Sequence, residues 1–357
     1  MNSAPKIVLT GGPSGGKTQA LNMLKIKLEA HGIKVYTVTE AATGVINNGF
    51  TGEKPSYEFQ KAIALYQLNA EENAEELSSN HNSVIICDRG LMDSRVYLND
   101  NDFSRLKYEL NMTEVDLRDR YDAVFHLDST AVDDSVIYET DAVRDETRAE
   151  ARCINDRSLR AWCGNPHYRF IPVCNSFEEK FNILYKEIKA FLGIPKPLEI
   201  ERKFLIKYPD IDYLMSFVCS KSEIEQSYML GENGKFRLRK RGRNGSYIYI
   251  KTVKNKISET VREEVEERLT ENEYNDLMNS STVIGSIKKD RYCLMYDGVY
   301  YEIDIFPFWK KQAYLEIELL SENDKIKLPE FIEVIREVTF DSRYKNSSLC
   351  RSIPAES

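Results

Sequence analysis

The stretch that decides the fold of the first half of the chain is KIVLTGGPSGGKT, Lys6–Thr18. A short apolar run leads into a glycine-rich loop, and the loop leads into an amphipathic stretch that reaches about Ala30. The segment GGPSGGKT, Gly11–Thr18, fits the pattern G-x-x-x-x-G-K-[ST], and it stands between a strand and a helix, where that pattern has meaning. Glycines let backbone N–H groups converge on phosphate oxygens at a helix N-terminus, where the helix dipole also favours an anion. The sequence therefore predicts a nucleotide phosphate site at this loop.

The predicted nucleotide-binding residues of this phosphate-binding loop are Gly11, Gly12, Pro13, Ser14, Gly15, Gly16, Lys17 and Thr18. Lys17 is expected to reach the β- and γ-phosphates of ATP or GTP, and the Thr18 hydroxyl is expected to hold Mg²⁺. Asp88 ends the apolar run SVIICD, where an acidic residue can contact Mg²⁺ directly or through water. Asp88 and Arg89 together resemble the acidic-Arg pair of nucleoside and nucleotide kinases. That resemblance implies a catalytic base at Asp88 and a substrate or phosphate ligand at Arg89; a plain strand end is the alternative.

Three arginines recur every four residues at Arg144, Arg148 and Arg152, so they form one stripe on a predicted helix. Glu146 and Glu150 lie among them, and an ion-paired, solvated helix face is one interpretation. Beside a phosphate-binding loop, the stripe favours a lid that brings arginines to the phosphates. Arg144 and Arg148 are accordingly predicted as nucleotide ligands.

The first half of the chain alternates apolar runs with helical stretches, which predicts βαβ units and a parallel sheet. The expected strands are Lys6–Thr10, Lys34–Glu40, Ser83–Asp88, Asp122–Asp128 and Arg169–Val173. Continuous runs such as IVL and VII are typical of strands that are covered on both faces. We therefore expect an α/β P-loop domain with helices on both faces of a parallel sheet over residues 1–194.

The pattern changes at GIPKP, Gly193–Pro197, which indicates a helix stop and a short linker. Period-two alternation dominates beyond it, with a helix at about Glu271–Ser280, so the second half is expected to be an α+β domain built on antiparallel strands. This second domain is predicted over residues 197–357.

The first half resembles the small P-loop kinase-like ATPase family, whose relatives include the kinase module of bacterial nicotinamide-nucleotide regulators. The resemblance covers about residues 1–190 and implies nucleotide binding. It is carried by GGPSGGKT, by the segment CDRG, and by the lid pattern Arg144, Glu146, Ala151, Asp156 and Trp162.

In the second half, LEIERKFLI places Glu199, Glu201 and Lys203 on one strand face, because side chains alternate with period two. Later strands repeat this theme of charged residues at alternate positions. They carry Arg237, Arg239, Arg241, Lys251, Arg262, Glu264, Glu266, Lys289, Arg291, Glu302, Asp304, Glu316 and Glu318. A wet outer face is one explanation. Mixed stripes of Arg, Lys and Glu also suit the inside of a barrel that holds a polyanion and a divalent metal.

This ordered set resembles the CYTH, or triphosphate tunnel metalloenzyme, family, whose signature E-x-E-x-K matches Glu199, Glu201 and Lys203. The resemblance implies an antiparallel β-barrel or tunnel that binds triphosphate groups with Mg²⁺ or Mn²⁺. The implied triphosphate ligands are Lys203, Arg237, Arg239, Lys251, Arg262, Lys289 and Arg291. The implied metal ligands are Glu199, Glu201, Glu316 and Glu318, in addition to Thr18 and Asp88 in the first half. Glu199, Glu201 and Lys203 are also implied as catalytic, and Lys345 as a further basic contact.

The chain has 49 basic and 57 acidic residues, a formal net charge of -8, and this balance disfavours general binding to nucleic acid or anionic membranes. It has no run of about 18 apolar residues, so we expect a cytoplasmic protein. Two functions remain open. One is Mg²⁺-dependent hydrolysis or transfer of phosphoryl groups on a nucleotide or another triphosphate compound. The other is a nucleotide-regulated switch that binds a phosphorylated lipid headgroup, since the domain order also resembles a eukaryotic trafficking family that binds GTP and phosphoinositides.

Overall fold

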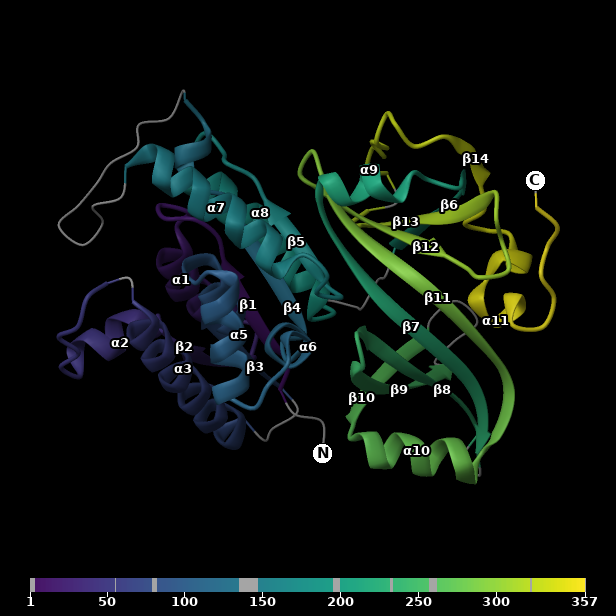
Figure 1. The fold of residues 1–357 in the computed structure, drawn as a ribbon, viewed down its shortest axis with the longest axis horizontal. Coiled ribbons are helices and arrows are strands. Elements are labelled where there is room, and N and C mark those ends of the chain that lie inside the picture. Colours follow the sequence, from purple (N-terminus) through teal and green to yellow (C-terminus); the bar gives the residue numbers. More distant parts are fainter. Residues whose placement is uncertain are drawn as a thin grey trace. The chain divides into compact units, whose positions relative to one another are not determined.

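The structure is a computed structural model, and it divides into two compact units, Met1–Phe191 and Leu192–Ser357, which are described separately. The residues described are 4–54, 56–78, 82–134, 147–194, 200–231, 234–256, 262–321 and 323–356, without the side chains of 254–256 and 262–264. Figure 1 shows the course of the chain through both units.

The N-terminal unit is built on a five-stranded parallel sheet with the strand order β2-β3-β1-β4-β5. Its strands are β1 (Lys6–Thr10), β2 (Lys34–Val38), β3 (Ser83–Asp88), β4 (Ala123–Leu127) and β5 (Tyr168–Ile171). Every residue of β1, β3 and β4 is buried, because helices cover both faces of the sheet. The predicted parallel sheet with two covered faces is confirmed.

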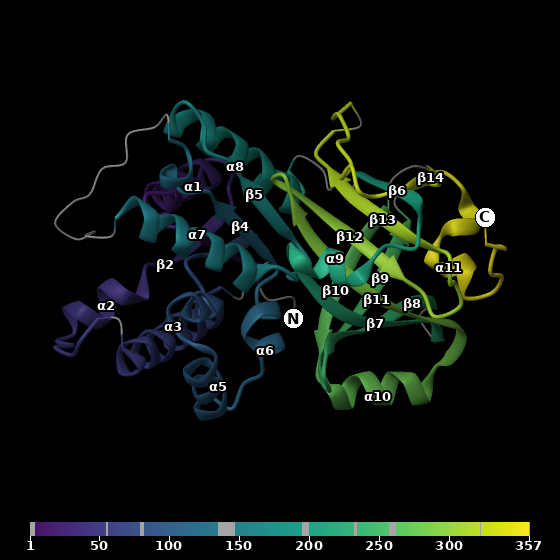
Figure 2. The ribbon, with the colours of Figure 1, turned by 45° about the horizontal axis from the view of Figure 1, so that its top comes forward.

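The helices of this unit are α1 (Lys17–Glu29), α2 (Ala41–Asn47), α3 (Tyr57–Leu77), α4 (Ser94–Tyr97), α5 (Asp100–Glu109), α6 (Glu114–Asp119), α7 (Arg148–Trp162) and α8 (Phe177–Phe191). Helices α1 and α8 are neighbours, with the Lys27 ammonium 5.9 Å from the ring centroid of Phe181. Helices α3, α4 and α7 form a second group, in which α4 contacts both of the others. Figures 1 and 2 show the helices of this unit from two directions.

The C-terminal unit is a nine-stranded antiparallel sheet with the order β10-β9-β8-β7-β11-β12-β13-β6-β14. Its strands are β6 (Ile200–Lys207), β7 (Val218–Gly231), β8 (Gly234–Arg243), β9 (Ser246–Lys256), β10 (Arg262–Leu269), β11 (Thr282–Tyr296), β12 (Val299–Ile305), β13 (Gln312–Leu319) and β14 (Val334–Glu337), and its helices are α9 (Ile211–Ser216), α10 (Glu271–Ser280) and α11 (Asn346–Leu349). The predicted antiparallel domain is confirmed. Within the described residues β10 and β14 do not pair with each other, so the hydrogen-bonded ladder is a sheet with two edges rather than a closed barrel.

One face of this sheet is charged. Cross-strand partners share a face, and the register from β6 to β10 puts the ionisable residues at alternate positions of these strands on one face, among a few apolar ones. We call it the charged face, and its ionisable members include Glu201, Lys203, Arg237, Arg239, Arg241, Glu266, Lys289, Arg291, Glu302, Asp304, Glu316 and Glu318. Four of them, Arg241, Lys289, Asp304 and Glu316, are buried, and Asp304 is 0% exposed. Around these four residues the charged face is therefore not a wet outer surface.

The apolar core lies mainly on the opposite face. Phe204, Ile303 and Leu315 pack there with Leu214 of α9, and Leu238 packs with Tyr274 of α10 in a separate cluster. A third cluster, around Trp309, Tyr314 and Tyr344, packs next to the charged face and includes Leu205 and Ile287. Two apolar clusters thus lie on the opposite face of the sheet, and a third, rich in aromatic side chains, lies next to the charged face.

Separate expression of residues 1–194 and 197–357 is expected to yield two pieces that each unfold cooperatively, because each unit has a sheet and a core of its own. Circular dichroism during thermal unfolding would measure this. A control piece that ends at residue 164 lacks β5 and α8 and should not unfold cooperatively. An unfolded 197–357 piece would contradict the expectation.

Candidate functional site

The phosphate-binding loop joins β1 to α1, and its backbone is shaped for close approach. Gly11, Ser14 and Gly16 have positive φ angles of 128°, 56° and 85°. A Cβ at Gly11 would lie 2.1 Å from the carbonyl oxygen of Leu127, and a Cβ at Gly16 would lie 2.6 Å from the ring of Phe177. Both positions therefore require glycine.

Lys17 is folded back over this loop. Its ammonium group donates hydrogen bonds to the carbonyl oxygens of Gly11, at 3.2 Å, and Gly12, at 2.7 Å. Burial lowers the pKa of Lys17 to about 7, Arg89 adds to the effect, and Asp88 opposes it. A phosphate bound here would supply the counter-charge that this buried ammonium lacks.

Thr18 and Asp88 meet at the start of α1. The Thr18 hydroxyl donates to Oδ2 of Asp88 at 2.6 Å, and Oδ1 of Asp88 is buried with no hydrogen-bond partner in the described part of the chain. Burial raises the pKa of Asp88, although Lys17 and the Thr18 hydrogen bond oppose the shift. A hydroxyl beside a carboxylate with an unused oxygen suits Mg²⁺, which prefers oxygen ligands. Thr18 and Asp88, which are predicted to hold Mg²⁺, therefore have the chemistry that this ion requires.

Arg89 is directed at the same loop. Its Nη1 donates to the Gly11 carbonyl oxygen at 3.3 Å, and its Nε lies 3.2 Å from a carboxylate oxygen of Glu40. The backbone of Arg89 has φ 73°, which is unusual for a residue with a side chain. Gln67 donates to the Arg89 carbonyl oxygen at 3.2 Å and Asp93 accepts from the Gly90 N–H at 2.9 Å, so the strained turn is held from two sides.

The two predicted lid arginines that the structure describes, Arg148 and Arg152, pair with a carboxylate. Arg148, at the start of α7, lies 3.4 Å from a carboxylate oxygen of Asp134, and Arg152 binds the same carboxylate. Glu150 instead closes the capping box of α7 with Thr147. Arg144 and Glu146 lie outside the described residues. The ion-paired interpretation of this stripe therefore describes the structure, and contact of Arg148 with phosphate remains a prediction.

The sequence analysis missed Lys180 of α8. Its ammonium group donates to the carbonyl oxygen of Gly15 at 2.9 Å and also binds the carbonyl oxygen of Asp128, and the residue is 5% exposed. Lys180 thus supports the loop from behind. No local pattern signals it, because the contact joins residues 165 positions apart.

In the C-terminal unit, ion pairs of Arg291 and Lys203 connect several carboxylates of the charged face. Arg291 lies 2.7 Å from Asp304 and 2.6 Å from Glu316, and it also binds Glu302. Lys203 lies 2.8 Å from Glu316 and 3.3 Å from Glu201. Two of the predicted phosphate ligands and two of the predicted metal ligands are thus brought into one network.

The carboxylates of this network repel one another. Repulsion from Glu316, together with burial, raises the pKa of Glu201 to about 7, although Lys203 and Arg291 oppose the shift. Burial alone would raise the pKa of Glu316, but Lys203, Lys289 and Arg291 hold it well below its usual range. Glu316 is therefore the charged member of the pair, and Glu201 is the member that an added cation would ionise.

The fit of a divalent metal rests on four glutamates of adjacent strands. Glu201 is the direct cross-strand partner of Glu318, and Glu302 is the partner of Glu316. Across the described residues, no three acidic, His or Cys side chains are gathered closely enough to hold a metal, and Glu316 is paired with both Lys203 and Arg291. Carboxylate oxygens are the right donors for Mg²⁺ or Mn²⁺. Glu199 lies outside the described residues.

The other end of the charged face is rich in arginine. Arg237 lies 3.3 Å from Glu266 and donates to the Thr252 hydroxyl at 3.1 Å. Burial and the neighbouring Arg237 lower the pKa of Arg239 to about 10, although Glu266 opposes the shift. Neighbouring guanidinium groups repel one another, so a polyanion that binds between them is stabilised.

The structure corrects the placement of Lys251. In register, Lys251 pairs with Leu238 and Glu267, which puts it on the face opposite Arg237 and Arg239. Its ammonium lies 3.2 Å from Glu267 and 6.0 Å from the ring centroid of Phe236. Lys251 therefore cannot share a ligand with the arginines of β8.

The remaining predicted positions have less support. The side chains of Arg262 and Glu264 lie outside the description, and Lys345 is exposed. Glu302 and Asp304 belong to the Arg291 network described above.

Arg239→Ala is expected to weaken triphosphate binding by about 10- to 150-fold, since a hydrogen bond to a charged group contributes roughly 1.5–3 kcal/mol. Lys251→Ala is the matched control, because it removes one cation from a neighbouring strand but from the opposite face. Calorimetric titration of the whole protein with tripolyphosphate would measure both. Equal losses in the two variants would contradict the assignment of faces.

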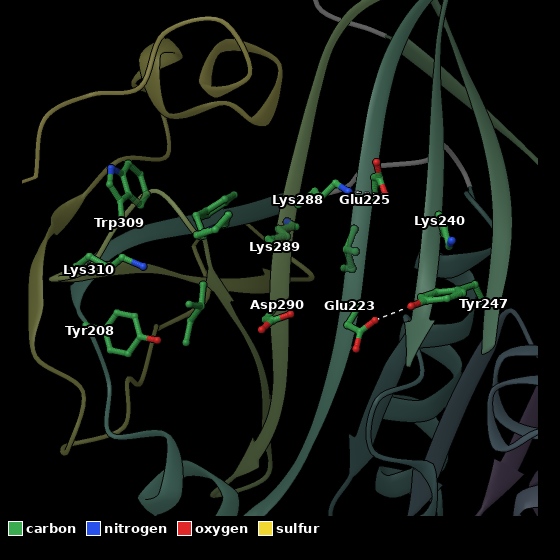
Figure 3. A pocket seen from close by; sticks show the side chains of 14 residues that line it. Tyr208, Glu223, Glu225, Lys240, Tyr247, Lys288, Lys289, Asp290, Trp309 and Lys310 are labelled. Carbon is green, nitrogen blue, oxygen red and sulfur yellow. Dashed lines mark hydrogen bonds and ion pairs between the residues drawn. The ribbon is translucent and has the colours of Figure 1, made fainter. Parts of the chain in front are cut away.

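A cavity of about 690 Å³ is lined by residues from both faces of the sheet at β7, β8 and β11, together with Phe306 and Trp309 (Figure 3). Its charged groups have partners: the Tyr247 hydroxyl donates to Glu223 at 2.6 Å, and the Lys240 ammonium lies 4.1 Å from the Tyr247 ring centroid. Lys289 is the one predicted ligand in its described lining, and its ammonium binds Asp304 on the charged face instead. Most of the charged residues that line this cavity therefore lie outside the candidate triphosphate site.

Two family models match the chain: an AAA domain at residues 6–180 and a CYTH domain at residues 197–348. The second half is 31% identical over 156 residues to an inorganic triphosphatase of Acetivibrio thermocellus, a match that spans 43% of this chain and 94% of the relative. The chain belongs to the CYTH family. An inorganic triphosphatase of Nitrosomonas europaea is 31% identical over 162 residues, which are 44% of this chain and 99% of that relative.

Among solved structures, a crystal structure of an inorganic triphosphatase aligns with 28% identity and a TM-score of 0.30, covering 44% of this chain and 97% of that one. The CYTH match coincides with the unit that carries the charged face, and the AAA match with the unit that carries the phosphate-binding loop. Within the described ranges, no helix combines the length and the apolar character that crossing a bilayer requires.

Proposed function

We propose that this CYTH protein hydrolyses a triphosphate compound on its charged face, with the help of a divalent ion, and binds a nucleotide at its phosphate-binding loop. The observation that carries the proposal is the buried network in which Lys203 and Arg291 share Glu316. Burying this many charges is costly unless a ligand uses them. The curated relatives that match this unit are both inorganic triphosphatases, which supports the same substrate class.

On the charged face, the cations would neutralise the phosphate chain and align its terminal phosphorus for attack. They are Lys203, Arg237, Arg239, Lys289 and Arg291. Glu201, Glu316 and Glu318 would hold Mg²⁺ or Mn²⁺, which supplies Lewis-acid stabilisation of the developing charge when bound. A carboxylate of this set would accept a proton from water as the water oxygen bonds to phosphorus and the bridging P–O bond breaks. Orthophosphate and the shortened chain would be the products.

In the N-terminal unit, Lys17 would bind the β- and γ-phosphates of ATP or GTP, and Thr18 and Asp88 would hold Mg²⁺. The ion-paired side chains of Arg89 and Glu40 would bind a phosphoryl acceptor, and transfer to a small molecule would be the kinase-like form of this activity. The buried Oδ1 of Asp88, which has no hydrogen-bond partner among the described residues, supports the metal site.

A panel of tripolyphosphate, ATP and GTP, each with Mg²⁺, Mn²⁺ or chelator, tests the proposal by release of phosphate from the whole protein. We expect metal-dependent release from at least one of the three compounds. The absence of release from all of them, with tight binding retained, would replace hydrolysis by a ligand-sensing role.

A further inference from the structure

Asn155, in the middle of α7, joins four segments of the N-terminal unit and is 1% exposed. Its Oδ1 accepts from the backbone N–H of Gly12 at 3.1 Å and from that of Ser129 at 3.2 Å. Its Nδ2 donates to the Asp128 carboxylate at 2.7 Å. The His126 ring nitrogen Nε2 lies 3.1 Å from the same Oδ1. One side-chain amide thus forms hydrogen bonds with both the phosphate-binding loop and the segment that follows β4.

Gly12 shows how closely the loop and α7 approach at this point. A Cβ at Gly12 would lie 2.9 Å from the Cβ atoms of both Asn155 and Ser129, and 3.1 Å from Oδ1 of Asn155. Unlike Gly11 and Gly16, Gly12 does not have a positive φ angle. The requirement for glycine at this position of the loop therefore comes from contact with α7 rather than from the turn.

Helix α7 is also the helix that carries the two described lid arginines. Arg152 binds the carbonyl oxygen of Ala131 and, with Arg148, the carboxylate of Asp134. The same helix therefore holds the segment after β4 through its arginines, and the phosphate-binding loop through Asn155.

We propose that Asn155 is a positioning residue that locks the phosphate-binding loop to α7, so that the affinity of the loop for nucleotide phosphates depends on this amide. The inference rests on the proposed nucleotide-binding function of the loop. Without Asn155, the buried N–H groups of Gly12 and Ser129 lose their acceptor, and the loop can satisfy Gly12 only by changing the backbone that cradles the phosphates.

The test is calorimetric titration of the whole protein with MgATP and with MgGTP. Asn155→Ala is expected to weaken binding about tenfold, the effect of one lost hydrogen bond of ordinary strength. Asn155→Leu, which keeps the side-chain volume, should show the same loss even if the alanine variant folds poorly. Ser158→Ala is the matched control, because Ser158 is 0% exposed one turn further along α7 and its hydroxyl lies 2.9 Å from that of Thr10. It should bind within about twofold of the wild type.

Thermal unfolding shows whether each variant is folded, and tripolyphosphate binding on the CYTH unit is the internal reference, which should not distinguish Asn155→Leu from Ser158→Ala. A double variant, Gly12→Ala with Asn155→Leu, should bind no more weakly than Gly12→Ala alone, because both changes break one contact. Wild-type affinity in both Asn155 variants, or additive losses in the double variant, would overturn the inference. If the wild type binds neither nucleotide, the proposed function of the loop itself fails.

Discussion

Glu201→Gln is expected to lower metal-dependent release of phosphate from tripolyphosphate by at least about 100-fold. Glutamine has the size of glutamate but no charge, so it deletes a metal ligand and leaves the packing of β6 intact. Phosphate release from the whole protein, measured with saturating Mg²⁺ and with Mn²⁺, gives the result. Glu225→Gln is the matched control, since Glu225 lies on β7 but on the face opposite the charged face.

The thermal stability of Glu201→Gln, unlike its activity, should not fall below that of the wild type. Repulsion from Glu316, with burial, raises the pKa of Glu201 to about 7, so the folded state favours its protonated form. Stability that depends on that proton is present below the ordinary pKa of a glutamate and is lost as the pH rises through about 7. Glutamine imitates the protonated form. In chelator, the variant should therefore unfold at a temperature equal to or above that of the wild type at pH 8.

The two parts of this prediction separate an active site from a packing role. Loss of activity with retained stability supports metal ligation by Glu201. A Glu201→Gln variant as active as Glu225→Gln would remove Glu201 from the site. A wild-type protein that binds tripolyphosphate but releases no phosphate would make the charged face a sensor.

Lys17→Ala is expected to weaken binding of MgATP or MgGTP by about 10- to 150-fold, because a hydrogen bond to a charged group contributes roughly 1.5–3 kcal/mol. In the structure the ammonium of Lys17 binds only the carbonyl oxygens of its own loop among the described residues, so it is available to a phosphate. Calorimetric titration would measure the affinity. Lys25→Ala removes an exposed cation from the same helix and is the matched control.

The pH dependence of nucleotide binding should show whether the ammonium of Lys17 contributes to the affinity. Burial and Arg89 hold the pKa of Lys17 at about 7, so above that pH the ligand-free ammonium has mostly lost its proton. A bound phosphate favours the charged form, and binding must then take up a proton. Wild-type affinity is expected to fall between pH 7 and pH 9, and Lys17→Ala should show a flatter profile. Unchanged affinity in Lys17→Ala would remove the assignment of the loop.

Local sequence determined much of this protein. The residues of GGPSGGKT are consecutive, so the strand, the turn and the helix start that make the phosphate-binding loop could be predicted together. Period-two alternation likewise placed Glu201 with Lys203 and Arg237 with Arg239, because side chains two positions apart share a face whatever the rest of the sheet does. The change of pattern at Gly193–Pro197 separated the α/β half from the β-rich half.

Only the tertiary structure decided which face Lys251 occupies. In SYIYIKT, the tyrosines alternate with isoleucines, and Lys251 follows the tyrosine row while Thr252 follows the isoleucine row. Either row could face inward, and the register of β9 against β8 makes the choice. The two faces of a strand are equivalent until pairing and burial distinguish them.

Contacts between distant segments were likewise beyond the reach of local pattern. Glu316 joins Lys203 to Arg291 across three strands, and Asn155 reaches the loop at Gly12 from 143 residues away. The spacing of residues within one segment predicts neither of these contacts. A motif shows which side chains one segment carries. Folding alone brings side chains of separate segments within hydrogen-bond distance. Folding also determines the burial that shifts the pKa values of Lys17 and Glu201.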